Sequence, residues 1–307
     1  MRVNPTQTLR LIGQPSLQNF LHFIKEQVIE ESPQPRSYWV SIWKQANNEY
    51  SALEEQERNI ANSIDIQLLP DTLAAKAESV RENPFYQSTF DKVATRFAWV
   101  ELEKLVVSQL DVNRDYNKRL DENATIDLSS PISQAQLFDF CLPPKADNNS
   151  VDIQRISHKR YQFSSESSDF RPHNNALLNA EQINDLQSFG PVSAVFGAPV
   201  GFGSNFLTAI ESQERLVLHN GYHRSLALLE AGIRYAPFII QSVECLDELE
   251  ICAQSKVVDD SNFYFGAARP PLLKDFLNPK LAKLFTVHRT KKVIEINIDV
   301  KEYQVRV

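Results

Sequence analysis

The residues of this chain best suited to chemistry form one short run, residues 219–224. Apolar residues predict a strand before this run and a helix after it, so the run would be a strand-to-helix turn. The first N–H groups of a helix lack partners within the helix, and the helix dipole adds about half a positive charge there. Gly221 would let a ligand approach these groups, and Arg224 could form a two-pronged hydrogen bond with phosphate oxygens. We therefore predict an anion site, most readily for a nucleotide phosphate.

The same turn has a purely structural interpretation, which stays open. Asn220 could be a simple helix N-cap, with His223 and Arg224 on a solvated first turn. In the functional interpretation His223 would instead donate a hydrogen bond or carry a proton. Short motifs often match by chance, so the turn alone does not decide between the two interpretations.

Glycine is concentrated around this turn. Six of the eight glycines lie between residues 190 and 232, where we expect special backbone geometry or close approach to a ligand. Gly201, Gly203 and Ser204 could form a second backbone wall facing the nucleotide. The alternative is a bulged connection before the next strand.

The elements that must position the turn follow from periodicity and turn residues. Residues 205–210 and 215–219 predict two strands joined by a short polar turn, and therefore a hairpin. Residues 225–231 predict a helix that Gly232 ends, and residues 238–240 predict a buried strand after Pro237. The tail, residues 292–307, alternates apolar and polar side chains and predicts a half-buried strand.

The first part of the chain differs in pattern. Apolar residues recur at helical spacing in residues 17–28, 38–66 and 90–110, and prolines punctuate these stretches. We therefore predict an α+β protein with a mostly helical region at residues 1–145, followed by an α/β domain with a small mixed sheet at residues 146–307.

Composition restricts the function classes. The 307 residues carry a formal net charge of −7, which argues against general coating of nucleic acid, although a nucleic-acid partner stays open. No secretory signal and no stretch long and apolar enough for a membrane span is visible, so we expect a cytoplasmic protein without a membrane partner. The three cysteines form no CxxC pair, and no redox cofactor is expected.

The turn also carries a family resemblance. Residues 221–232, GYHRSLALLEAG, followed by PFII at residues 237–240, resemble the signature of the ParB/sulfiredoxin-like superfamily over about residues 185–243. The resemblance implies binding of the phosphates of ATP, ADP or CTP, with Mg²⁺ as the companion ion. It implies phosphate contacts from Gly221, His223 and Arg224, with Asn220 and Tyr222 flanking them.

Three departures narrow what the resemblance implies. Sulfiredoxins need a cysteine where this chain has Tyr222, which argues against sulfinic-acid reduction. Free-serine kinases of the superfamily have an acidic residue where this chain has Asn220, and an amide cannot act as a base. Chromosome-partitioning ParB proteins continue into helix-turn-helix domains, for which the residues after 240 leave little room.

Two functions remain. The first is a nucleotide-binding protein that acts as a phosphotransferase or nucleotide hydrolase, with His219, His223, Glu211 or Glu214 as candidate bases. The second is a non-catalytic module, gated by a nucleotide or another anion, whose helical region binds a protein or nucleic-acid partner. A turn that binds nothing is a third outcome. We predict no metal site formed by the protein, because His219 and His223 would not share a helix face.

Two further segments could have a function. Basic residues gather at Lys283, His288, Arg289, Lys291 and Lys292, where they could steer a polyanion or simply form a solvated surface. Residues 269–276 combine Pro270-Pro271 with an apolar run, which could be a lid or a plain loop followed by a short helix.

Overall fold

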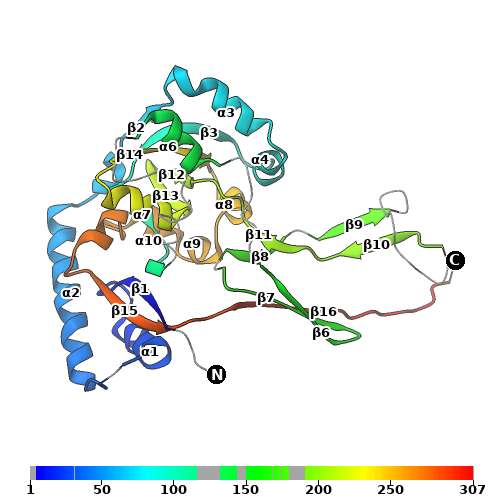
Figure 1. Ribbon diagram of the computed structural model, residues 1–307, viewed down its shortest axis with the longest axis horizontal. Helices are drawn as coiled ribbons and strands as arrows, with labels where there is room; N and C mark the ends of the chain where they lie inside the picture. The colour runs from blue at the N-terminus through cyan, green and yellow to red at the C-terminus, as the bar shows by residue number, and fades with distance from the viewer. Residues whose placement is uncertain are drawn as a thin grey trace. The chain divides into compact units, whose positions relative to one another are not determined.

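The computed structural model describes residues 5–30, 32–115, 132–143, 150–167, 169–173, 175–179 and 191–306 (Figure 1). The chain divides into two compact units, each built from two separate stretches of sequence. The first unit contains Met1–Ala146 and Ser204–Arg289, and the second contains Asp147–Gly203 and Thr290–Val307. Helices and strands occur together in the first unit, so the protein is of the α+β class.

A six-stranded mixed sheet is the centre of the first unit (Figure 1). Its spatial order is β2-β3-β14-β12-β13-β4, with β12 parallel to β14 and antiparallel to β13. The four inner strands, β3, β14, β12 and β13, are therefore paired on both edges. The strands are β2 (Ile66–Leu68), β3 (Thr95–Glu101), β4 (Val106–Val107), β12 (Thr208–Ser212), β13 (Arg215–Asn220) and β14 (Tyr235–Ser242).

Helices cover both faces of this sheet. On β13, Leu216 and Leu218 belong to one hydrophobic cluster and Val217 to another, as the alternation of side chains across a strand requires. The first cluster includes residues of α3 (Ala74–Arg81), α6 (Gln134–Cys141) and α7 (Tyr222–Glu230). The second includes residues of η1 (Ile60–Ser63), α8 (Leu246–Cys252), α9 (Ser255–Asp259) and α10 (Ser261–Gly266). The short elements η2 (Asp71–Leu73) and α4 (Pro84–Thr89) lie on either side of α3 in the chain.

A smaller sheet, β15-β1-β5, supports a third cluster in the same unit. It consists of β1 (Pro5–Leu11), β5 (Asp111–Asn113) and β15 (Ala282–His288). Phe285 and Val287 on β15 pack with Phe20 and Phe23 of α1 (Leu17–Gln27) and with Ile42 of α2 (Arg36–Gln56). This cluster buries one face of the sheet against the two N-terminal helices.

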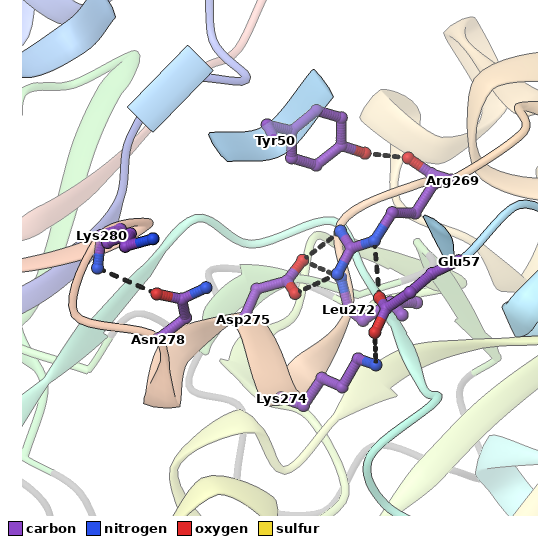
Figure 2. Close-up of polar contacts among 8 residues, drawn as sticks. All are labelled: Tyr50, Glu57, Arg269, Leu272, Lys274, Asp275, Asn278 and Lys280. Atoms are coloured by element: carbon purple, nitrogen blue, oxygen red, sulfur yellow. Dashed lines mark hydrogen bonds and ion pairs between the residues drawn. The ribbon is translucent and has the colours of Figure 1, made fainter. Parts of the chain in front are cut away.

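A buried ion network joins the end of α2 to the segment before β15 (Figure 2). The guanidinium of Arg269 is fully buried and forms two hydrogen bonds with Asp275, at 2.6 and 2.9 Å, and one with Glu57 at 2.9 Å. Lys274 also contacts Glu57, and the Tyr50 hydroxyl donates to the Arg269 carbonyl oxygen. The segment of residues 269–276, which could have been a lid, is thus a loop followed by the 3-10 helix η4 (Leu273–Leu277). It is held in the interior of the unit.

The second unit consists of strands among the residues that the structure describes. A three-stranded antiparallel sheet has the order β16-β7-β6, and two ribbons pair β10 with β9 and β11 with β8. The strands are β6 (Asp152–Ser157), β7 (Arg160–Ser165), β8 (Phe170–Pro172), β9 (Ala176–Asn179), β10 (Ala194–Gly197), β11 (Val200–Phe202) and β16 (Lys292–Asn297). The predicted tail strand therefore ends at Asn297.

The predicted mostly helical region of residues 1–145 holds α1 to α4 and α6, but its described residues also form the strands β1 to β5. The predicted helix at residues 90–110 was wrong, because this stretch contains β3. β3 pairs with β2 and β14 and buries side chains on both of its faces, so its apolar run lacks the alternation that identifies a half-buried strand. The predicted division at 145/146 also differs from the observed units, because β12 to β15 return to the first unit.

Candidate functional site: the turn between β13 and α7

The predicted strand-to-helix turn is present, with the hairpin β12–β13 before it and the strand β14 after α7. β13 ends at Asn220 and α7 begins at Tyr222, so one residue, Gly221, makes the whole reversal. Gly221 has a φ of +97°, and a Cβ built there would lie 2.8 Å from Leu207 Cδ1. Both the left-handed backbone and the close packing require glycine at this position.

Asn220 fixes the turn through both ends of its side-chain amide. Its Oδ1 accepts a hydrogen bond from the Gly221 N–H at 2.8 Å, and its Nδ2 donates to the Ser204 carbonyl oxygen at 2.5 Å. The structure therefore brings Asn220, Gly221 and Ser204 together, as the sequence suggested for a common site. Ser204 takes part through its backbone carbonyl oxygen and not through its hydroxyl group.

Tyr222 is buried in the core next to the turn. Its hydroxyl donates to the Leu218 carbonyl oxygen at 2.7 Å and accepts from the Ser108 N–H at 3.0 Å. Burial raises the pKa of this phenol. The side chain ties α7 to β13 and to the residue that follows β4, which is a structural role that the sequence did not indicate.

His223 is held as a neutral acceptor. Its Nε2 accepts the Asn113 N–H at 3.2 Å, which places the proton of a neutral imidazole on Nδ1. Burial, assisted by the positive charge of Arg224, lowers the pKa of His223 to about 4. The imidazole is therefore uncharged at neutral pH and could offer a phosphate only an N–H hydrogen bond, without a charge.

Arg224 is buried and reaches the end of another helix. Its Nη1 donates to the carbonyl oxygens of Phe140 at 3.1 Å and Cys141 at 3.0 Å, the last two residues of α6. The last carbonyl groups of a helix lack partners within it, and a cation there also matches the helix dipole. Arg224 is thus a C-terminal cap for α6, and a phosphate would have to use its other N–H groups or displace these carbonyls.

The structure does not bring Glu211 to the turn. Thr208 is opposite Asn220 in the ladder and Glu211 is opposite Leu216, so Glu211 lies three residues further along β12, about 10 Å away at the usual rise per residue. Its carboxylate pairs with both terminal nitrogens of Arg96 and accepts from Ser242, and these contacts lower its pKa. Glu214 lies in the hairpin turn at the same far end.

Gly201 and Gly203 belong to the second unit, where they pack closely against side chains of β8 and its flanks. A Cβ on Gly203 would lie 2.4 Å from Arg171 Nη2, and one on Gly201 would lie 3.0 Å from His173 Nε2. His219 precedes Asn220 on β13 and is half-buried. Of the predicted contacts outside residues 220–224, the structure shows Ser204 bonded to the turn. Gly201 and Gly203 pack against side chains of the second unit.

Two buried hydroxyl groups beside the turn were not singled out from the sequence. Thr208, opposite Asn220, and Ser225, on the first turn and a half of α7, have hydroxyl oxygens with no partner among the described residues. Within an apolar strand or helix, the sequence around a serine or threonine does not indicate that its hydroxyl group will be buried without a partner. No group of three or more metal-ligating side chains is found within the described residues.

Comparison of the chain with models of known protein families, with curated proteins and with solved structures finds no match. Among the helices that the structure describes, none has the length and apolar character of a membrane span.

Proposed function

We propose that the chain is a nucleotide-binding protein of the ParB/sulfiredoxin-like type, which acts as a nucleotide-gated interaction module. One observation carries the proposal: a single left-handed glycine, Gly221, sets the N-terminus of α7 directly against the end of β13. The N–H groups of the first turn of a helix are the usual anchors of a phosphate. The resemblance of residues 221–240 to the superfamily signature supports a nucleotide as the source of that phosphate.

The side chains of the turn favour binding over catalysis. A general base must lie within hydrogen-bond reach of the proton that it removes. His223 has its Nε2 lone pair engaged by Asn113, and Glu211 is both distant and paired with Arg96. The proposal therefore leaves out phosphotransfer and nucleotide hydrolysis by His223 or Glu211. His219, half-buried at the end of β13, is the candidate base that these contacts do not exclude.

Arg224 supplies the gate. A hydrogen bond from a guanidinium to a phosphate has charge on both partners and is roughly twice as strong as one between neutral groups. A phosphate bound at α7 would compete with the carbonyl oxygens of Phe140 and Cys141 for Arg224. Nucleotide binding would then loosen the end of α6, and we expect a protein partner that contacts the helices of residues 1–145 to sense this change.

The test is a calorimetric titration of the wild type with ATP, ADP, CTP and GTP, each with Mg²⁺. We expect one nucleotide to bind, and Arg224→Lys to weaken it by about tenfold or more, because lysine lacks the planar fork of arginine. Arg234→Lys, an exposed arginine beyond α7, is the matched control and should bind like the wild type. The proposal fails if no nucleotide binds to the wild type, or if Arg234→Lys weakens binding as much as Arg224→Lys.

A second measurement separates the module from an enzyme. Phosphate release is followed at saturating nucleotide, with the wild type and Arg224→Lys side by side. The module predicts no release above the level without protein. Release by the wild type that Arg224→Lys abolishes would show that the turn is catalytic and would overturn the non-catalytic part of the proposal.

A further inference from the structure

An open pocket in the first unit lies between residues of α2 and β15. Its volume is about 540 Å³, within the range of small-molecule sites. The residues that line it come from the end of β1, from α2, from the turn after η4 and from β15: Ile12, Ile42, Gln45, Asn48, Glu49, Pro279, Lys280 and Lys283.

Two local contacts hold the walls of the pocket in place. Asn47 of α2 donates from its side-chain amide to the Gly13 carbonyl oxygen at 2.8 Å, which fixes the helix against the loop that follows β1. On the other side, the Lys280 N–H donates to Asn278 Oδ1 at 2.9 Å and shapes the turn that leads into β15 (Figure 2). These walls are therefore held by contacts within the protein.

The charges of the pocket do not balance. Lys280 pairs with Glu49 at 2.8 Å, and the hydrogen bond from Lys280 lowers the pKa of Glu49. Arg10, the cross-strand neighbour of Lys283, is paired with Asp111 at 2.6 Å. Among the described residues, none forms a hydrogen bond or ion pair with the Lys283 side chain. The positive charge of Lys283 therefore has no counter-charge among the described residues of the pocket.

Lys283 lies at the margin of an apolar cluster. β15 alternates its faces, so Lys283 shares a face with Phe285 and Val287, which are buried in the cluster formed with α1 and α2. Lys283 itself is half-buried. An ammonium group at the margin of an apolar cluster loses part of its hydration, and a counter-charge would restore the balance.

We propose that this pocket binds a small organic molecule with one carboxylate and a short apolar body. The carboxylate would pair with Lys283, the side-chain amides of Gln45 and Asn48 would supply hydrogen bonds, and Ile12, Ile42 and Pro279 would contact the apolar part. A single surplus positive charge suits a monoanion and not a nucleoside triphosphate. This site is therefore separate from the proposed nucleotide site and does not depend on it.

Saturation-transfer NMR with hexanoate and benzoate as probes tests the proposal, with hexanamide and benzamide as uncharged counterparts. We expect transfer from the wild type to the carboxylates and much less to the amides. Lys283→Gln should weaken carboxylate binding about tenfold or more, as expected for loss of a charged hydrogen bond. Lys44→Gln is the matched control, because Lys44 is exposed on α2 and does not line the pocket.

A second variant tests the place of binding without changing a charge. Asn48 is exposed on α2, so Asn48→Trp should fold, fill the pocket and abolish the signal. The proposal is overturned by no transfer to either carboxylate from the wild type, by equal signals for acids and amides, or by Lys283→Gln and Asn48→Trp proteins that bind like the wild type.

Discussion

Arg224 Nη1 lies 3.0 Å from the carbonyl oxygen of Cys141, so a side chain at the start of α7 caps the end of α6. The same carbonyl oxygen accepts the Leu207 N–H at 2.9 Å. These contacts join the turn that resembles a phosphate site to a helix far from it in sequence. Arg224 is therefore the residue through which binding at the turn would affect the end of α6.

Replacing Arg224 should therefore cost stability even without a ligand. Arg224→Ala leaves the Phe140 and Cys141 carbonyl groups without this donor, and we expect a loss of about 1–3 kcal/mol in the free energy of unfolding. Urea denaturation measures the loss. Arg234→Ala removes an exposed arginine and should change stability by less than about 0.5 kcal/mol. Equal effects of the two substitutions would refute the capping role.

The two glycines that flank α7 offer a matched comparison. Gly221 and Gly232 both have positive φ, at +97° and +81°, but only Gly221 has close neighbours where a Cβ would be placed. Gly232→Ala should cost about 1–2 kcal/mol from backbone strain alone. Gly221→Ala adds a clash with Leu207 and should cost clearly more in the same denaturation assay. Similar losses would mean that Leu207 moves aside easily.

His223 should make stability depend on pH. Its pKa in the folded protein is about 4, below the ordinary 6.5, so the unfolded chain binds the proton more readily between these values. Stability contributed by neutral His223 is thus present above pH 6.5 and is lost as pH falls toward 4. His223→Gln keeps an acceptor for the Asn113 N–H but does not titrate. Its unfolding free energy should fall less than that of the wild type between pH 7 and pH 4.5.

The control for this pH profile is His288→Gln, which removes an exposed histidine. Its profile should follow that of the wild type. A wild-type profile that His223→Gln leaves unchanged would contradict the neutral state of His223, as would an NMR titration of its ring with a midpoint near 6.5.

The buried network of Figure 2 should respond strongly to the loss of one charge. Asp275→Asn leaves the fully buried Arg269 guanidinium with only Glu57 as a charged partner, and we expect a cost of about 3–5 kcal/mol. Asp139→Asn breaks the exposed pair with Lys76 and should cost less than about 1 kcal/mol. Denaturation of the two variants compares them directly, and equal costs would show that Arg269 is solvated.

The sequence predicted the elements around the turn because their signals are local. Alternating and continuous apolar runs indicated β12, β13 and β14, and Gly232 indicated the end of α7. Gly221 was singled out for its backbone freedom, which its φ of +97° confirms. These features depend on residues a few positions apart, where periodicity and turn chemistry are informative.

The partners of the turn could not be predicted, because they come from distant parts of the chain. Tyr222 contacts Ser108, His223 contacts Asn113 and Arg224 contacts the end of α6. No local pattern encodes these contacts. The strand β3 was missed for a related reason: it pairs with β14, more than a hundred residues away, and its two buried faces hide the alternation. Phosphate contact by the turn stays a prediction.

The most direct test of the central claim is hydrogen exchange of the amides of α6 and of the start of α7, with and without saturating nucleotide. Binding at the turn with competition for Arg224 predicts slower exchange at residues 222–224 and faster exchange at the end of α6, near Phe140 and Cys141. Exchange that is unchanged in both segments with ATP, ADP, CTP and GTP would contradict the claim. Protection of α7 with an unchanged α6 would keep the nucleotide site but refute the gate.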